Sequence, residues 1–183
     1  QLEPELQRLT HQAQIRWLGI TARIVADTSH PMLQRAVPSG VWDVVMVGFN
    51  LLNPSARQCV LNKTVELDVG VQDMFAVRRA LSDPDALREE IRKAAAAGQL
   101  DPATLDANDP LAEILAASGA SCLIELAYRF CRHEPGVHVV LTGTGRVNHL
   151  IDNVAYINGP PLPEHTQATL AEIFGRVDCL SGN

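Results

Sequence analysis

The residues between Gly136 and Val154 have the types and the spacing that a phosphate site needs. Val137 to Leu141 predict a buried strand, Thr142 to Gly145 a turn of small residues, and a helix is expected to begin near Arg146 to Asn148. The first backbone N–H groups of a helix lack partners and its dipole favours negative charge, so phosphate binds well at this position. Glycines in the turn let the backbone approach a ligand closely. Spacing alone leaves a phosphate site and a plain strand-to-helix turn both open.

The order of residues after this strand is more specific than the spacing. Thr142-Gly143-Thr144-Gly145 is followed by His149-Leu150 and, after one residue, by Asp152-Asn153. This order resembles the last strand and following helix of the aldo-keto reductases, which in that family clasp the adenosine 2′-phosphate and adenine end of NADPH. The resemblance implies NADP(H), with NAD(H) as the alternative, and it implies cofactor contacts at Thr142, Gly143, Thr144, Gly145, Arg146, His149, Asp152 and Asn153.

The resemblance also implies a division of roles among these residues. Gly143 and Thr144 would give backbone and hydroxyl hydrogen bonds to a 2′-phosphate, with Arg146 as its charge partner. The pair Asp152-Asn153 would contact the amino edge of adenine. His149 stands where an Arg or Gln is frequent, and a neutral imidazole would weaken phosphate pairing near pH 7.

Composition narrows the class of protein. The chain has 183 residues, of which 46% are hydrophobic and 20% charged, enough for one domain with a core. A net charge of −6 argues against nucleic acid and anionic membranes as partners, and no apolar run is long enough to span a membrane. The four cysteines have no metal-binding spacing, so we expect reduced thiols in a cytoplasmic protein and no metal site. Because Gln1 already lies within a helical pattern, we expect the chain to be a piece of a longer protein.

Apolar runs and helical patterns alternate along the chain. Strands are expected at 15–20, 41–47, from 66–71 and at 137–141, and helices at 2–13, 31–36, 54–61, 122–133 and 163–174. The first three strands start about 25 residues apart with a helix in each gap, a pattern typical of a parallel sheet in either a doubly wound fold or a (β/α)8 barrel. The third gap is longer, and we expect a single partial domain over 1–183 with an irregular insertion at about 83–118.

The family resemblance extends across this order of elements. Ile15 to Thr21 resembles the fifth strand of the aldo-keto reductase barrel, Val44 to Leu52 the sixth, and Gly70 to Leu81 the seventh in altered form. The implied fold class is therefore α/β, the C-terminal half (strands five to eight) of a (β/α)8 TIM barrel of aldo-keto reductase type.

Residues for carbonyl reduction are not expected in this chain. The family uses a Tyr proton donor with Lys, Asp and His at the ends of strands two to four, which this resemblance places upstream. The only tyrosines, Tyr128 and Tyr156, fall within helical patterns, and the only lysines, Lys63 and Lys93, in a loop and a helix. Since barrel chemistry takes place at the carboxyl ends of strands, we assign no catalytic residue.

The nicotinamide end of a cofactor would lie on the earlier strands. The resemblance implies contacts there from Thr21, Met46, Met74, Phe75 and Arg78. Ala22 and Met46 replace the family's Asn and Gln and cannot make their amide hydrogen bonds, whereas Met74 can pack against a ring without stacking specifically. Arg78 would approach the pyrophosphate. Asp73 is interpreted as a polar strand residue in preference to a pocket acid.

Three functions remain open at this point. The first is the NAD(P)H-binding half of an oxidoreductase that reduces a carbonyl by hydride transfer, the second a non-catalytic regulatory or interaction protein on the same scaffold, and the third another phosphate-binding barrel. The expected partners are a nicotinamide dinucleotide and either the missing N-terminal half or a second copy. Either protein partner would cover two exposed edges, at 15–20 and 137–141, and an inner sheet face around Val45, Val47 and Val71.

Overall fold

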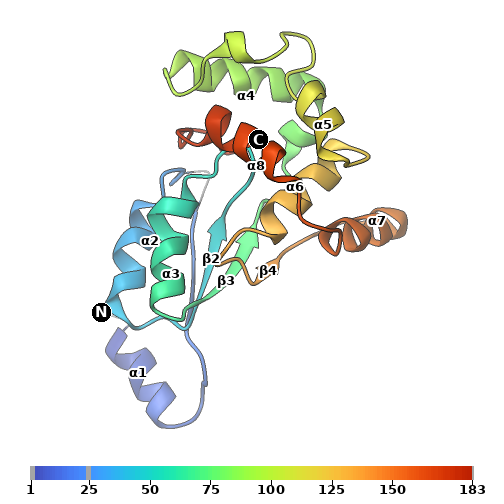
Figure 1. Ribbon diagram of the computed structural model, residues 1–183. Helices are drawn as coiled ribbons and strands as arrows, with labels where there is room; N and C mark the ends of the chain where they lie inside the picture. The colour runs from blue at the N-terminus through green and yellow to red at the C-terminus, as the bar shows by residue number, and fades with distance from the viewer. Residues whose placement is uncertain (1–2, 24–25, 183) are drawn as a thin grey trace.

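A four-stranded parallel sheet forms the centre of the protein. The computed structural model describes residues 3–23 and 26–182, and its strands are β1 (Gly19–Thr21), β2 (Val44–Gly48), β3 (Gly70–Met74) and β4 (Val139–Val140). They lie in the order β1-β2-β3-β4 and every pair is parallel, with the first three starting about 25 residues apart as the sequence predicts (Figure 1). The outermost strands are β1 and β4, so both expected edges are present.

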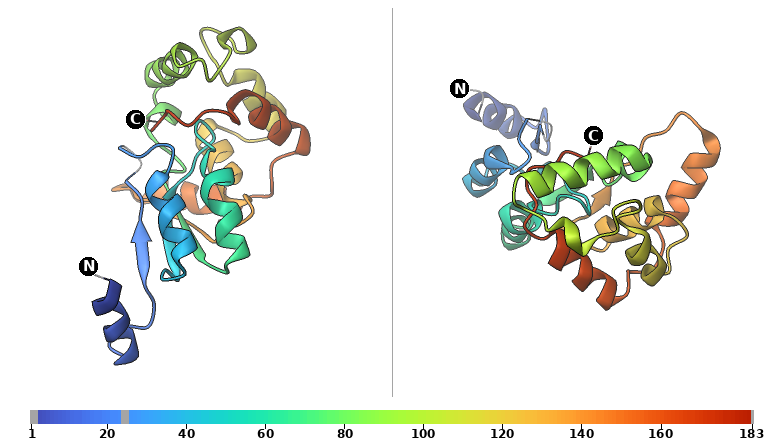
Figure 2. Two further views of the ribbon diagram at one scale, coloured as in Figure 1. Left: turned by 90° about the vertical axis from the view of Figure 1, so that its left-hand side faces the viewer. Right: turned by 90° about the horizontal axis from the view of Figure 1, so that it is seen from above.

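Helices fill each gap between the strands. Their bounds are α1 (Glu3–His11), α2 (Pro31–Ala36), η1 (Val37–Ser39), η2 (Arg57–Leu61), α3 (Asn62–Glu66), η3 (Arg79–Leu81), α4 (Pro84–Ala96), η4 (Pro102–Thr104), α5 (Ala112–Ser118), α6 (Leu123–Arg132), α7 (Val147–Ile157) and α8 (Glu164–Phe174). The segment 83–118, which we expected to be an irregular insertion, contains two regular helices, α4 and α5. Together with α8 they lie beyond the carboxyl ends of the strands (Figures 1 and 2).

All four strands begin later than the sequence predicts, β2 and β4 by two or three residues and β1 and β3 by four. The ladder with β2 starts only at Gly19, because the Asp43 carboxylate accepts the Leu18 backbone N–H at 2.7 Å and keeps this N–H from pairing with a strand. Residues 15–18 therefore lie outside the sheet. The third strand begins at Gly70 and not at 66, because the helix continues through Glu66 and the chain then turns at Asp68, where φ is +56°. Residue 2, where the expected first helix starts, lies outside the described residues.

Helices cover one face of the sheet and leave the other open, and the prediction of which residues lie on the open face is wrong. Val45, Val47 and Val71, which we expected on the open inner face, are at most 1% exposed and belong to the main core. Successive side chains of a strand point to opposite faces of the sheet. The face that carries these three valines is therefore the covered face, and the residues between them form the set on the open face. That set includes one row across all four strands, formed by Thr21, Met46, Gln72 and Val139, all of which are partly or fully exposed.

Helix α7, which follows β4, is much less buried than its neighbour α6. α7 packs against α6 at one side of the molecule, yet none of its residues is buried (Figure 1). Four apolar side chains, which we call the α7 stripe, are 48–73% exposed at helical spacing: Val147, Leu150, Ile151 and Val154. Among the described residues, no single helix is long and apolar enough to cross a membrane; α5 and α6 meet that test only as a pair, bent by 64°.

Candidate functional site

A cavity of about 610 Å³ lies where the chain leaves β3 and β4. Met74 and Phe75 form one wall at the end of β3, and Leu141 to Thr144 form another after β4. The third wall comes from helices α6 and α7. Ligand sites of parallel α/β folds lie at the carboxyl ends of the strands, and this volume is within the usual range for a ligand pocket.

The cavity brings together seven of the thirteen residues that the resemblance assigns to a cofactor. They are Met74, Phe75, Thr142, Gly143, Thr144, His149 and Asn153. Gly145 and Arg146 follow directly in the turn at the start of α7, and Asp152 is exposed beside Asn153. Thr21 and Met46 lie side by side on the open face of the sheet but do not line this cavity.

The turn after β4 leaves room for an anion. Cβ atoms added at Gly143 and Gly145 would meet nothing within 4 Å, so the space beside the backbone is open. No side chain among the described residues caps the N-terminus of the eleven-residue helix α7. The Arg146 backbone N–H donates to the Thr144 hydroxyl at 3.1 Å and holds the turn, while the Arg146 side chain remains exposed at the positive end of the helix.

The wall after β3 is shaped by a strained residue. Phe75 has φ of +74°, a conformation that is unusual for a bulky side chain and concentrates at functional sites. The guanidinium of Arg78 lies 4.0 Å from the centre of the Phe75 ring, a cation–π contact. Partial burial lowers the pKa of Arg78 from its ordinary value, although a guanidinium stays charged at any physiological pH. Arg78 thus lies behind the ring and does not line the cavity.

Three polar side chains connect the walls. Thr142 Oγ1 lies 2.8 Å from the hydroxyl of Tyr128 on α6 and accepts a hydrogen bond from Asn153 Nδ2, also at 2.8 Å. Tyr128 is 4% exposed, and this burial raises the pKa of its phenol. The sequence placed Tyr128 in a helix interior without a role. Ile124 and Tyr128 lie one turn apart on α6, and both line the cavity. Their spacing of four residues, which places them on one face of the helix, is the sequence signal that could have indicated them.

Asp73 lies behind the sheet and away from the cavity. Its side chain is fully buried, Oδ1 accepts the Phe49 backbone N–H at 3.0 Å, and Oδ2 has no partner among the described residues. Burial raises the pKa of this carboxyl well above its ordinary value. The interpretation of Asp73 as a strand residue agrees with this position.

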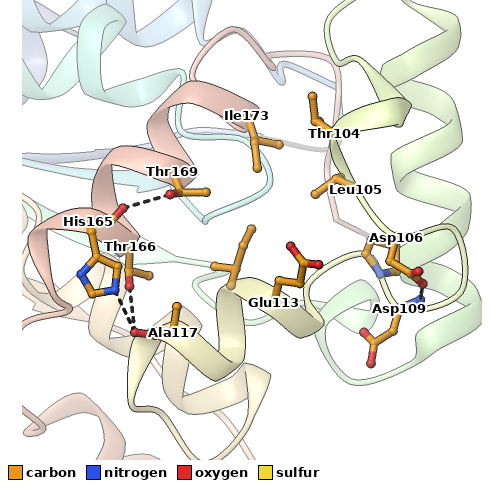
Figure 3. Close-up of a pocket in the computed structure, with 12 residues that line it drawn as sticks. Thr104, Leu105, Asp106, Asp109, Glu113, Ala117, His165, Thr166, Thr169 and Ile173 are labelled. Carbon is orange, nitrogen blue, oxygen red and sulfur yellow. Dashed lines mark hydrogen bonds between the residues drawn. The ribbon is translucent and has the colours of Figure 1, made fainter.

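A second cavity, of about 230 Å³, lies between α5, α8 and the loop at 104–110 (Figure 3). Its lining includes the apolar side chains of Leu105 and Ile173 and the acidic residues Asp106, Asp109 and Glu113. It contains none of the residues that the sequence singles out. Among the described residues there is no group of three side chains that could hold a metal ion.

The sheet order, the helix after each strand and the site at the carboxyl ends define half of a parallel (β/α) barrel. No protein-family model and no curated protein matches the sequence. Solved structures do match. An aldo-keto reductase of Bacillus halodurans in its holo form is 14% identical with a TM-score of 0.64, and the match covers 98% of this chain and 57% of that one. For a Klebsiella pneumoniae aldo-keto reductase in complex with NADP and acetate, the identity is 16%, the TM-score 0.57, and the coverage 97% and 57%.

A glycerol dehydrogenase of Gluconobacter oxydans is similar at 18% identity and a TM-score of 0.61, with 94% of this chain and 53% of that chain covered. These likenesses show that the chain has the fold of the C-terminal half of an aldo-keto reductase barrel. The chain spans just over half the length of the solved structures that it matches.

Proposed function

We propose that this chain is the NADP(H)-binding half of an aldo-keto reductase-like oxidoreductase, whose carbonyl-reducing residues lie in the other half of the barrel. The observation that carries the proposal is the cavity at the ends of β3 and β4, because it gathers residues from two strands, one turn and two helices. The fold supports it, since the Klebsiella structures of this fold are complexes with NADP or NADPH.

The adenosine end of the dinucleotide is proposed to bind along the turn and the start of α7. Gly143 and Thr144 offer an open turn, and Arg146 offers a full positive charge beside uncapped helix N–H groups. Only NADPH carries a 2′-phosphate. A hydrogen bond between a charged pair contributes roughly 1.5–3 kcal/mol, which corresponds to about a 10- to 100-fold change in affinity.

The test is calorimetric titration of the chain with NADPH and with NADH. Arg146→Ala is expected to weaken NADPH by about 10-fold or more and NADH little. The matched control is Arg92→Ala, which removes an exposed arginine of α4 paired with Glu89 and is expected to change neither affinity. Equal losses for the two cofactors in Arg146→Ala would show that the phosphate lies elsewhere, and no binding by the unmodified chain would refute the nucleotide site.

The chain alone is proposed to be inactive in carbonyl reduction. Tyr128 lines the cavity, but burial raises its pKa and its hydroxyl is already bonded to Thr142; Tyr156 lies on α7 outside the cavity. Neither lysine lines the cavity. NADPH oxidation followed by absorbance with a panel of aldehydes and ketones tests this point, and turnover by the pure 183-residue protein would contradict it.

A second part of the proposal concerns the open surfaces. Two sets of apolar side chains are exposed: the α7 stripe, and Val139 and Leu141 on and directly after the edge strand β4. We propose that the N-terminal half of the same barrel covers them, since the solved structures with this fold extend well beyond the part that this chain matches. Light scattering of the chain with and without that half tests the pairing, and a self-associated dimer that the other half does not dissociate would contradict it.

A further inference from the structure

The second cavity is separate from the candidate nucleotide site, because different described residues line the two (Figure 3). Its volume of about 230 Å³ is a little below the usual range for ligand pockets, so it suits a molecule smaller than a nucleotide. Leu105, Ile114 and Ile173 line its apolar part, and Ile114 is only 6% exposed. A ligand that fills this cavity therefore needs an apolar body.

The hydroxyl and imidazole groups that line this cavity already donate their protons within the protein. The hydroxyls of Thr104 and Thr169 donate to backbone carbonyls three and four residues earlier, at 2.7 and 3.0 Å. The Thr166 hydroxyl, at 3.3 Å, and His165 Nε2, at 3.1 Å, share the Ala117 carbonyl oxygen. Since a carbonyl oxygen only accepts hydrogen bonds, Nε2 carries the proton of the neutral imidazole. These four side chains therefore offer a ligand lone pairs and no free donor.

The remaining polar side chains of the lining are the carboxylates of Asp106, Asp109 and Glu113. Among the described residues that line the cavity there is no lysine or arginine, and the ion pairs between described residues use other carboxylates. Asp106 Oδ1 accepts the backbone N–H groups of Asp109 and Asn108, both at 2.8 Å, which lowers the pKa of this carboxyl and keeps it ionised. The cavity thus has a negative charge that no side chain of its lining neutralises.

Arg88 contacts the loop at 104–110 but does not line the cavity. Its Nη1 donates to the Asn108 carbonyl oxygen at 2.7 Å, and its guanidinium pairs with Asp85 on the same helix, so it does not compete for the carboxylates of the cavity. Within the described part of the chain those carboxylates form no group that could hold a metal ion. The charge that they can bind is therefore that of an organic cation.

We propose that this cavity binds a small organic cation, an alkylammonium or arylalkylammonium ion, with its apolar body against Ile114 and Ile173 and its N–H groups donating to Glu113. An ammonium group has donors and no acceptor, which is the complement of this lining. In Figure 3 the Glu113 carboxylate points from α5 toward Leu105 and Ile173, so charge and apolar surface meet in one space. The site is independent of the proposed function, because it uses none of the residues of the nucleotide cavity.

The test titrates the chain with three probes that share one ring and differ in the head group: benzylammonium, benzyl alcohol and benzoate. Backbone amide NMR shifts locate and quantify the binding. Benzylammonium is expected to shift the signals of 104–117 and 165–173 with a dissociation constant of about 1–10 mM, as its small size implies. Benzyl alcohol, which lacks the charge, should bind about 3- to 10-fold more weakly, and benzoate should not bind there.

Three variants separate the cavity from a general attraction of cations to an acidic protein. Glu113→Gln keeps the side-chain shape and removes its charge, so benzylammonium should bind about 3- to 10-fold more weakly and benzyl alcohol unchanged. Asp68→Asn is the matched control, because it removes one exposed carboxylate from the turn before β3, where asparagine also tolerates the φ of +56°; it should change neither affinity. Ala117→Leu adds three carbon atoms to the lining and should abolish the binding of both probes.

Equal weakening of benzylammonium by Glu113→Gln and Asp68→Asn would mean attraction to the net charge of the protein and would refute the site. The site is also refuted if Ala117→Leu leaves binding unchanged, if benzyl alcohol binds as tightly as the cation, or if none of the three probes shifts these signals. Misfolding of Ala117→Leu would move amide signals throughout the chain before any probe is added, and Glu113→Gln, whose side chain is exposed, then decides the test. None of these outcomes involves NADPH, so a failure here and a failure of the nucleotide site are distinguishable.

Discussion

The two faces of the sheet differ in what covers them. On one face Val45, Val47 and Val71 are fully buried, together with the stacked rings of Phe49 and Phe130, whose centres are 5.4 Å apart. On the other face the row from Thr21 to Val139 is open, and helix α7, which packs against α6, has no buried residue. The contrast teaches that one face carries the packing that stabilises this chain, whereas the other is the face that we propose a partner covers.

The candidate nucleotide site lies where these two regions meet. Its wall on α6 belongs to the buried core, whereas its wall on α7 belongs to the unburied helix. His149 and Asn153 face the cavity from α7, and the α7 stripe lies on another side of the same helix. Ligand binding and completion of the barrel would therefore stabilise the same helix from two sides.

The largest expected effect is on the covered face. Phe49→Ala removes a fully buried ring that stacks on Phe130, and it should lower the free energy of unfolding by about 3–5 kcal/mol. Trp17→Ala is the control, because that large side chain is 71% exposed, and it should cost less than about 0.5 kcal/mol. Urea unfolding measures both. Comparable losses would mean that burial on the covered face contributes no more to stability than an exposed side chain does.

An ion pair on the covered face should matter next. Arg57 donates to both oxygens of Glu134 at 2.6 Å, and its guanidinium lies 5.5 Å from the centre of the Phe130 ring. The Glu134 side chain is 7% exposed, so Glu134→Gln should cost about 2 kcal/mol by leaving the arginine without its charged partner. Glu66→Gln in the exposed pair with Lys63 should cost at most about 0.5 kcal/mol in the same unfolding measurement.

Asp73 should make the covered face sensitive to pH. Because burial raises the pKa of this carboxyl, the native state keeps its proton at pH values where the unfolded chain, with an ordinary pKa near 4, has lost it. Stability should therefore fall as pH rises above about 4, by at most about 1.4 kcal/mol per pH unit, until the native pKa is passed. In Asp73→Asn, which has no carboxyl to titrate, this fall in the free energy of unfolding with rising pH should be absent. Urea unfolding of both proteins from pH 4 to 8 tests it, and parallel curves would contradict it.

The smallest effect on stability is expected at the α7 stripe. Ile151→Ser replaces a side chain that is 62% exposed, so the unfolding free energy of the isolated chain should change by no more than about 0.5 kcal/mol. Association with the N-terminal half, measured by light scattering, should weaken at the same time. Val65→Ser, which replaces a 58% exposed apolar side chain on α3, should affect neither quantity. A large loss of stability in Ile151→Ser would show that the stripe is already packed.

The sequence predicted much of the fold because its signals were local. The spacing of the β-branched runs gave the parallel sheet, and Pro163 and Gly175 marked the ends of the last helix. The prediction that Val45 lies on the open face was wrong, because a nearly continuous apolar run does not show which alternate residues point to which face of the sheet. In the candidate site, the motif predicted a role for Thr142 to Asn153, but a motif cannot show that Tyr128 packs beneath it, because that contact depends on how distant segments of the chain meet.

Hydrogen exchange of the isolated chain, with and without NADPH, tests the central claim most directly, because it reports on both regions at once. The amides of β2 and β3 should exchange slowly in both states and those of α7 quickly without nucleotide; NADPH should then slow exchange from Thr142 to Asn153. Slow exchange in α7 without ligand would contradict the difference between the two regions. Protection that appears only around 104–117 and 165–173, beside the second cavity, would contradict the nucleotide site.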